Sequence, residues 1–536
     1  MMSLPSRLRE FIRIRTRRWV TNQIIHHMAD EVARHAPIPD KQPIIFFNAS
    51  TRLAGLSLNA AFSLLSAWSL RLQGVPIVHF VCGHGLSKCV LGTDRRDMDA
   101  PMPCKHCIHQ SQVLYQNSDV HWFEFKSDHA LDEVLTDLNV EEFKSFEYKD
   151  VPLGPLVLPS VRWILRRHHL SDDAPTKLVY RHYICSAWHV KKQFELLLDE
   201  VKPQSVVVFN GMLYPEATAR WVAEQRDLPV YTHEVGMGAF SAFFTSGEAT
   251  AYPVNIPENF QLSETQNEKL DAYLSKRIKG DFSMAGIQFW PEMSSLDADF
   301  LKLCEKFKQI VPIFTNVIFD TSQLHANVVF PHMFAWLDSV LDIAKDHPET
   351  LFVIRAHPDE SRPGKESQES VADWAEAHEL GQIPNMVFIG PDTFFSSYEM
   401  IRRAKFIMIY NSTIGLEASI MGTPVLCAGK ARFTQLPTVF FPLTQDAFRE
   451  KAEIFLNAKA IDVPPEQPIN ARRFLYYQLY CTSLTFGDFL EEDNIWNGFV
   501  KLRRFDWKKL LPENSPVLQV ISDGLLNNSD FLLKEK

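Results

Sequence analysis

The stretch FIMIYNSTIGLEASIMGTPVLCAG, residues 406–429, predicts a strand, a polar turn, a helix and a second strand. Phe406 to Tyr410 is an unbroken apolar run, which is typical of a parallel strand buried on both faces. The Asn-Ser-Thr turn at 411–413 contains residue types that cap helices, and Gly422 marks the end of the helix. Phosphates bind at such a helix N-terminus when it follows a strand of an open parallel sheet. The stretch is therefore either an anion-binding βαβ unit or an ordinary one whose cap stabilises only its own helix.

Length and composition indicate a folded protein of more than one domain. A chain of 536 residues exceeds the size of a single core, and 46% hydrophobic residues provide ample apolar surface to bury. The formal charge of −10 argues against a general nucleic-acid binder. No apolar run approaches the roughly 20 residues that span a bilayer, and no apolar signal segment opens the chain. The eight cysteines are expected to stay reduced, so we expect a cytoplasmic protein.

The first part of the chain, residues 1–40, is predicted to be a basic helical arm. Residues 4–20 carry six arginines, and their apolar residues near helical spacing are Leu8, Phe11, Ile12 and Trp19. Such a helix suits the surface of an anionic membrane or an acidic partner, which would place the protein peripherally at the inner face of the membrane. The alternative is a solvated helix that packs one face on the rest of the protein.

Alternating strands and helices follow from residue 41. Pro43–Asn48 and Val75–Val81 are predicted strands on either side of a helix at Leu53–Leu72, and this order predicts a parallel α/β sheet. The Pro-rich passage at 151–159 is predicted to be a turn or an extended segment inside the same domain.

A further predicted strand, Pro229–Gly236, brings His233 and Glu234 to the carboxyl edge of this sheet. Gly236 then allows close approach of the backbone to a ligand. A carboxylate at this edge can take a proton from an acceptor hydroxyl, provided that burial raises its pKa toward neutrality. The alternative is an ordinary surface glutamate at a strand end.

Four of the eight cysteines fall within 26 positions, namely Cys82, Cys89, Cys104 and Cys107. The last two form a C-x-x-C pair, and four thiolates complete a tetrahedral structural zinc site. The first pair is spaced more widely than in a usual zinc knuckle. Reduced buried thiols, a redox-active Cys104/Cys107 pair and an iron–sulfur cluster are the alternatives.

A second α/β series begins near residue 311. Its strand Leu351–Ala356 contains Arg355 and is followed by His357 and Pro358, and the proline stops the strand and fixes where His357 points. An imidazole at that edge can donate a hydrogen bond to a diphosphate or a leaving phosphate. The alternative is a histidine satisfied by the backbone at the edge of the core.

Together these residues carry a resemblance. The motifs Arg355-Ala-His357-Pro358 and Asn411 to Val425, preceded by Phe314 to Asp320, resemble bacterial capsular-polysaccharide biosynthesis glycosyltransferases of GT-B architecture. The chain is also similar to the inverting sialyl- and Kdo-transferase groups, which combine an acidic motif ending in Gly, a His-Pro motif and a Ser-Ser or Ser-Thr motif. His233 stands where those groups often have a second carboxylate, and the four-cysteine segment lies outside the resemblance.

The resemblance implies an α/β fold of two Rossmann-like domains facing a cleft. Residues 41–300, with the four-cysteine insertion at 82–107, would bind the acceptor, and residues 301–460 the nucleotide sugar. Residues 461–536 would be a linker and C-terminal helices that cross back to the first domain.

The implied reaction is transfer of a sugar from a CMP- or UDP-linked donor to a hydroxyl of a glycan or lipid-linked glycan, with inversion and without a required metal or other cofactor. Glu234 would be the base, and His357 would stabilise the leaving phosphate. The implied donor-binding residues are Ser412, Thr413, Glu417, Arg355, Asn316, Gly236 and His233, with Asp320 beside them. A sugar-nucleotide epimerase or hydrolase, and a binding component of glycan assembly without catalysis, are the alternative functions.

Overall fold

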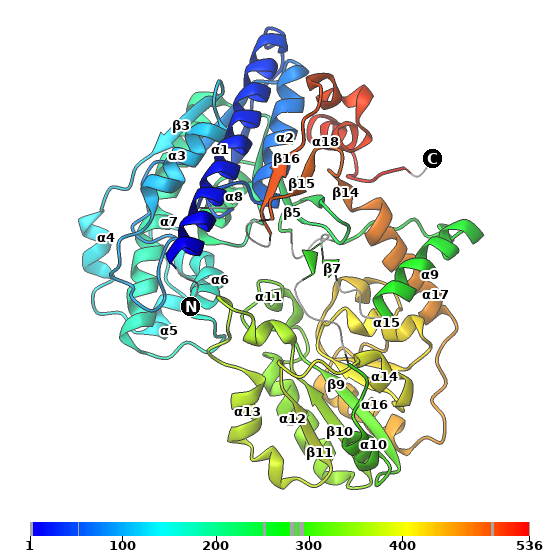
Figure 1. The fold of residues 1–536 in the computed structure, drawn as a ribbon. Coiled ribbons are helices and arrows are strands. Elements are labelled where there is room, and N and C mark those ends of the chain that lie inside the picture. Colours follow the sequence, from blue (N-terminus) through cyan, green and yellow to red (C-terminus); the bar gives the residue numbers. More distant parts are fainter. Residues whose placement is uncertain are drawn as a thin grey trace.

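The computed structural model describes residues 4–51, 53–249, 253–278, 283–284, 287–288, 294–494 and 498–534. Figure 1 shows two α/β domains, one above the other, with helix α1 (Leu4–His35) running along the upper one. The N-terminal half of the chain forms the upper domain and residues from about 300 form the lower one.

The N-terminal domain is built on a seven-stranded sheet in the order β14-β6-β5-β4-β1-β2-β3. Strands β1 to β5 are parallel, while β6 and β14 each pair antiparallel with their neighbour. The core of this order, 3-2-1-4-5, is that of a Rossmann-like sheet. The strands are β1 (Ile44–Phe47), β2 (Ile77–Cys82), β3 (Asp119–Phe123), β4 (Ser205–Phe209), β5 (Val230–Val235), β6 (Ser241–Ser246) and β14 (Leu484–Thr485).

Helices cover both faces of this sheet (Figure 1). Helix α2 begins at Leu58 rather than Leu53, because Ser57 caps it by accepting from the amide of Ala60 at 3.2 Å. After α1, the helices of the domain include α2 (Leu58–Leu72), α3 (Cys104–Leu114), α4 (His129–Val134), α5 (Val140–Lys144), α6 (Leu153–Leu165), α7 (Ala174–Val201) and α8 (Tyr214–Glu224).

The prediction for the Pro-rich passage was wrong, since residues 153–165 form α6 with Pro159 inside it. Proline at the first turn of a helix costs little, but an interior proline removes a backbone hydrogen bond. Leu153, Leu156, Val157, Val161 and Ile164 are nevertheless buried along one face of α6. Burial of this apolar face outweighs the local cost of Pro159.

The C-terminal domain has a five-stranded parallel sheet in the order β11-β10-β9-β12-β13. Its strands are β9 (Gln309–Phe314), β10 (Thr350–Arg355), β11 (Met386–Ile389), β12 (Ile407–Ile409) and β13 (Val425–Cys427). Its helices include α10 (Ala298–Cys304), α11 (Gln323–Ala326), α12 (Met333–Asp346), α13 (Val371–Ala377), α14 (Ser397–Arg403), α15 (Ile414–Ile420) and α16 (Gln445–Asn457). The strand, turn, helix and strand predicted at 406–429 are confirmed as β12, α15 and β13.

The end of the chain crosses back to the N-terminal domain, as the sequence predicted. Helix α17 (Glu466–Tyr476) packs with α9 (Glu264–Ile278) and α15, and β14 then pairs with β6. Helix α18 (Pro516–Asn527) buries Leu518, Ile521 and Leu525 in the core that also contains α2. Residues beyond 484 therefore belong in space to the N-terminal domain rather than to a separate tail.

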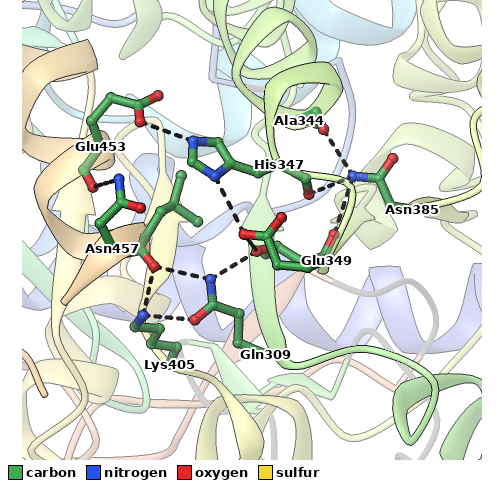
Figure 2. Close-up of polar contacts among 10 residues, drawn as sticks. Gln309, Ala344, His347, Glu349, Asn385, Lys405, Glu453 and Asn457 are labelled. Carbon is green, nitrogen blue, oxygen red and sulfur yellow. Dashed lines mark hydrogen bonds and ion pairs between the residues drawn. The ribbon is translucent and has the colours of Figure 1, made fainter. Parts of the chain in front are cut away.

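The amino ends of strands β9 and β10 carry a closed polar network (Figure 2). Asn385 donates to the carbonyls of Ala344, His347 and Thr350 at 2.8, 3.0 and 3.2 Å. Lys405 donates to Gln309 at 2.6 Å and to the Leu456 carbonyl at 2.8 Å. Because these groups satisfy one another, this edge of the sheet is structural, and the polar residues of interest lie at the opposite edge.

Candidate active site between the two sheets

Loops at the carboxyl ends of both parallel sheets meet at the domain interface. Arg95, after β2, donates to the carbonyl of Gly364, after β10, at 3.1 Å. His325 in α11, after β9, forms an ion pair with Glu248, after β6, with 2.7 Å between Nε2 and Oε2. The domains have between them a cavity of about 10 Å³, lined by Pro159, Arg162 and His168 and by residues 318–321, 323 and 324. Two Rossmann-like sheets with opposed carboxyl edges are the GT-B architecture that the sequence predicted.

Glu234 lies at the carboxyl end of β5 and is half-buried. Its Oε1 accepts from Asn59 Nδ2 at 2.9 Å, and its Oε2 accepts from Asn210 Nδ2 at 2.8 Å. Asn210 has φ of +56°, a left-handed conformation that asparagine tolerates better than most residues, so its amide can turn back toward β5. The Val235 amide also donates to Oε1 at 2.8 Å, so three neutral donors fix the carboxylate without neutralising its charge, which suits a group that must accept a proton.

His233, the residue before Glu234, is fully buried and points into the core. Its ring packs against Phe209 and Phe244, and its Nε2 lies 3.2 Å from Asn48 Oδ1. Burial lowers the pKa of His233 to about 3, so the ring is neutral at physiological pH. The predicted donor contact is not what the structure shows: alternation along β5 turns His233 away from the edge on which Glu234 lies.

Glu216, which the sequence reasoning missed, lies beneath the loop that follows β1. It is fully buried, and its Oε1 accepts from the Ser50 amide at 2.6 Å. Burial raises the pKa of Glu216 to about 7 against the effect of this bond. The carboxyl therefore supports the loop beside Asn59 and Glu234. The sequence feature that could have singled out Glu216 is its position as the acidic residue in the first turn of α8.

His357 follows β10 and caps the short 3₁₀ helix Pro358–Ser361. Its Nδ1 accepts from the amide of Asp359 at 3.1 Å, so in the neutral ring the proton is on Nε2. Burial lowers the pKa of His357, while the charges of Asp359 and Asp320 act in the other direction. With its proton on Nε2 the ring can donate from that atom, and the stabilisation of a leaving phosphate by His357 stays a prediction.

Ser412 and Thr413 form the turn between β12 and α15. Gly415 lets α15 lie close to the strand, because a Cβ there would be 2.2 Å from Ile409 Cδ1. Thr413 is at the N-cap position but its side chain makes no capping bond, and it is exposed. Among the described residues, neither hydroxyl makes a hydrogen bond. The two hydroxyls are available at the carboxyl edge of the sheet, as the sequence predicted.

Glu417 and Arg355 do not reach the site in the way predicted. Glu417 is buried in α15, where it pairs with Arg277 and accepts from the hydroxyl of Tyr398 at 2.6 Å. Both of its oxygens are engaged, so no ribose contact is assigned to it. Arg355 is also buried, and its Nη1 donates to the carbonyl of Gly390 at 2.6 Å. Burial lowers the pKa of Arg355 to about 10.

Asn316 and Gly236 shape the backbone around the site. The side-chain oxygen of Asn316 accepts from the amide of Asn411 at 3.3 Å, which joins the ends of β9 and β12. Gly236 is buried in the turn from β5 to β6, where a Cβ would lie 2.5 Å from Ser241 Oγ and 3.2 Å from Ser483 Oγ. The glycine is thus required mainly by close packing against Ser241 of β6, with Ser483 of the returning C-terminal segment beside it. Asp320 is exposed and accepts from Ser322.

A chain of polar contacts joins the two halves of the site, and sequence reasoning missed most of it. Arg220 donates to the carbonyl of Gly211, next to Asn210, at 3.1 Å, and to Glu248 at 2.6 Å. Glu248 pairs with His325, and Gln323 of the same short helix donates to Asn411 at 3.2 Å. The route from Glu234 to the Ser412 turn therefore passes through α11, whose two polar residues carry no recognisable motif.

The four predicted zinc ligands are all free thiols at the β2 end of the N-terminal domain. Burial raises the pKa of Cys82 to about 12, with the neighbouring Cys89 acting in the same direction. Cys82 Sγ accepts from the amide of Gly85 at 3.2 Å. Within the described part of the chain, no three His, Cys, Asp or Glu side chains are arranged to hold a metal ion. Structural zinc at these cysteines thus stays a prediction.

Comparison with known proteins supports the resemblance that the motifs carry. Residues 267–449 match the family described as capsule polysaccharide biosynthesis protein. Protein FixF of Sinorhizobium fredii (strain NBRC 101917 / NGR234) is 25% identical over 256 residues, which are 45% of this chain and 55% of that protein. The chain thus spans little more than half the length of this curated relative.

Solved structures with a related arrangement are distant. KpsC of Thermosulfurimonas dismutans, a β-Kdo 2,4 transferase, has a TM-score of 0.34 at 12% identity, over 52% of this chain and 80% of that one. UDP-GlcNAc 2-epimerase from Neisseria meningitidis has a TM-score of 0.24 at 12% identity, over 82% of this chain and 99% of that one. Neither likeness carries a conclusion about activity.

Proposed function

From the match of residues 267–449 to capsule polysaccharide biosynthesis proteins, we propose that the chain is a glycosyltransferase. It moves a sugar from a CMP- or UDP-linked donor to a hydroxyl of a capsular, surface or lipid-linked glycan. The observation that carries the proposal is that each sheet has, at its carboxyl edge, one titratable side chain whose orientation is fixed by hydrogen bonds. Glu234 is a carboxylate held by Asn59 and Asn210, and His357 is held so that Nε2 donates.

The proposed reaction is a single displacement. Glu234 takes the proton of the acceptor hydroxyl as its oxygen attacks the anomeric carbon. The bond between that carbon and the nucleotide phosphate breaks, its electron pair leaves with the phosphate, and the configuration inverts. His357 donates through Nε2 to the departing phosphate, and the hydroxyls of Ser412 and Thr413 hold its other oxygens. Neutral donors of this kind can stabilise the leaving group without a metal ion.

The N-terminal half of α1 suits contact with an anionic membrane, where a lipid-linked acceptor would be found. Ile12, Trp19 and Val20 are 55%, 62% and 39% exposed, and they lie near one another on the helix surface, beside exposed arginines at 9, 13 and 15. The other half of the helix is packed, with Ile25, Met28 and Val32 buried. The side chains of Leu8 and Phe11 lie outside the described residues. Across the described chain, no helix is long and apolar enough to span a bilayer.

The membrane proposal is tested by co-sedimentation with vesicles containing anionic lipid. Trp19→Ser with Ile12→Ser should reduce binding about tenfold or more, because each apolar side chain buries area at the interface. Equal binding of this variant and the unchanged protein would contradict it.

A screen of thermal stability tests the transferase proposal. CMP, UDP, GDP and their sugars are added singly, and a donor that binds raises Tm in proportion to the logarithm of its saturation. The stabilising sugar nucleotide is then incubated with glycan acceptors. Acceptor-dependent release of nucleotide supports the proposal. Free sugar or an epimer without acceptor would instead indicate a hydrolase or epimerase, and binding without any turnover would indicate a non-catalytic component.

A further inference from the structure

Arg166 places a cation of the N-terminal domain against the C-terminal domain. It ends helix α6 and is only 3% exposed. Its Cζ lies 3.9 Å from the ring centroid of Trp163 in the same helix and 4.9 Å from that of Phe319, which follows β9. Its carbonyl accepts from the amide of Gln368 at 2.9 Å. The guanidinium therefore stands between the domains, among the loops at the carboxyl edge of the second sheet.

The buried guanidinium of Arg166 makes no ion pair with a described carboxylate, although the charge of Glu366 acts on it. Its Nε and Nη1 are buried and make no hydrogen bond with any described residue. Buried charges are normally paired, because the loss of hydration is costly, and contact with two aromatic rings offsets only part of that cost. Burial lowers the pKa of Arg166 to about 10, with Arg95 acting in the same direction, so the group is still charged at neutral pH. An oxyanion is the kind of group that this position lacks.

A second cation, Lys365, belongs to the loop that His357 begins. Its charge interacts with those of Arg166, Asp359 and Asp320. Within the described chain its ammonium group makes no hydrogen bond or ion pair. Arg95, the other nearby cation, is already paired with Glu366 at 3.7 Å and with the Gly364 carbonyl. Among the described residues, neither the Lys365 ammonium nor the Arg166 guanidinium thus makes a hydrogen bond or ion pair with a protein oxygen.

This place adjoins the leaving-group side of the site. Asp320, whose neighbour Phe319 lies against Arg166, interacts electrostatically with both His357 and Lys365. Arg166, Lys365 and His357 therefore each interact with the segment Phe319–Asp320, the first by a ring contact and the other two electrostatically. An anion bound between the first two would contact one cation from each domain.

We propose that Arg166 and Lys365 form an anion site for a phosphate group of the nucleotide donor, adjoining the Nε2 donor of His357. The site deepens the proposed function and rests on it. Arginine presents a planar fork of donors that matches two phosphate oxygens, and lysine adds a point charge from the other domain. Binding of the donor then draws the two domains together, and the departing phosphate is stabilised from both sides.

The test is calorimetric titration of inorganic pyrophosphate, CMP and UDP into the full-length protein, with cytidine and uridine as uncharged counterparts. Arg166→Met keeps the length and apolar stem of the side chain but removes the charge, and Arg226→Met removes only a surface ion pair with Asp199. We expect Arg166→Met and Lys365→Met each to weaken binding of pyrophosphate and of the stabilising nucleotide at least about tenfold, as loss of a charge-assisted hydrogen bond requires. Arg226→Met should leave both affinities unchanged.

If Arg166→Met does not fold, Lys365→Met still tests the loss of one of the two charges. Arg166→Lys keeps the charge but removes the planar fork of donors, so it tests whether that fork is needed. A lower Tm with affinities within twofold of the unchanged protein would show that Arg166 only clamps the domains, and would overturn the anion site. Absence of any binding by the unchanged protein would overturn it as well. Binding that depends on Arg166 without transfer to any acceptor would leave the anion site standing and remove the transferase.

Discussion

His325 of the C-terminal domain and Glu248 of the N-terminal domain form an ion pair across the interface, with 2.7 Å between Nε2 and Oε2. Glu248 also pairs with Arg220 at 2.6 Å, and Arg220 bonds the backbone beside Asn210, which holds Glu234. The contact between the domains is thereby connected to the proposed base. A movement of one domain against the other would therefore shift Glu234 through the side chains of Glu248, Arg220 and Asn210.

Glu248→Gln should lower the free energy of unfolding by about 1–3 kcal/mol, because it leaves Arg220 without one carboxylate partner in a half-buried place. Burial would raise the pKa of Glu248, but His325 and Arg220 outweigh it and the pKa is lowered. The stabilisation is therefore present at neutral pH and is lost as pH falls below the ordinary carboxyl value of 4.5 toward the folded-state pKa. Urea unfolding at pH 7 and pH 4 measures both effects.

The matched control is Glu224→Gln, which pairs with the same arginine on its more exposed side. It should cost less than about 0.5 kcal/mol. An equal loss of unfolding free energy in Glu248→Gln and Glu224→Gln would show that the interdomain contact stabilises the protein no more than the exposed pair does.

Glu216→Gln should change how stability depends on pH. The pKa of Glu216 is raised from 4.5 to about 7, so its carboxyl favours the folded state most at pH below 4.5 and this advantage is lost as pH rises to about 7. Relative to the unchanged protein, the glutamine variant should gain up to about 3 kcal/mol between pH 4.5 and 7.5. Unfolding curves recorded across this range provide the measurement, and parallel curves for the two proteins would refute the assignment.

Asn385→Ala should destabilise the C-terminal domain by about 1–3 kcal/mol, since three carbonyls lose a side-chain donor at once while those of Ala344 and His347 keep a backbone amide (Figure 2). Asn457→Ala is the control, because Asn457 is exposed and makes one bond, to the Glu453 carbonyl at 2.9 Å. It should cost less than about 1 kcal/mol. Urea midpoints that fall equally for both variants would contradict the role given to the buried network.

The cysteine prediction is open to direct measurement. If Cys82, Cys89, Cys104 and Cys107 bind structural zinc, protein purified without chelator contains one zinc per chain, and chelation lowers its Tm. Conversion of all four residues to serine should then abolish the metal content. Folded protein with neither zinc nor iron, and with these four thiols reactive once unfolded, would remove the metal prediction.

The order of strands and helices could be predicted from the sequence because each element repeats one pattern. Apolar runs of four to six residues become buried parallel strands, and the strand predicted at Leu351–Ala356 is β10 at Thr350–Arg355. The exception is α6, where proline signalled a turn but tertiary burial of one helical face decided the structure.

Side-chain direction was harder to predict than position. Glu234, His357, Ser412 and Thr413 lie at the strand ends that the motifs indicated, yet the adjacent His233 points into the core. Glu417 was expected to bind the donor but is buried with Arg277 and Tyr398. No sequence pattern indicated Arg166 or His325, because their contacts are with residues of the other domain, which are distant in sequence.

The most direct test of the account is Glu234→Gln, assayed for both donor binding and transfer. Loss of a general base should lower kcat about 100- to 10,000-fold. The Kd for the donor nucleotide should stay within about twofold, because Ser412, Thr413 and His357 lie in the other domain. Asn59→Ala, which removes one of the two side-chain donors to the carboxylate, should have a smaller effect on kcat. Transfer by Glu234→Gln at a near-normal rate would contradict the central claim.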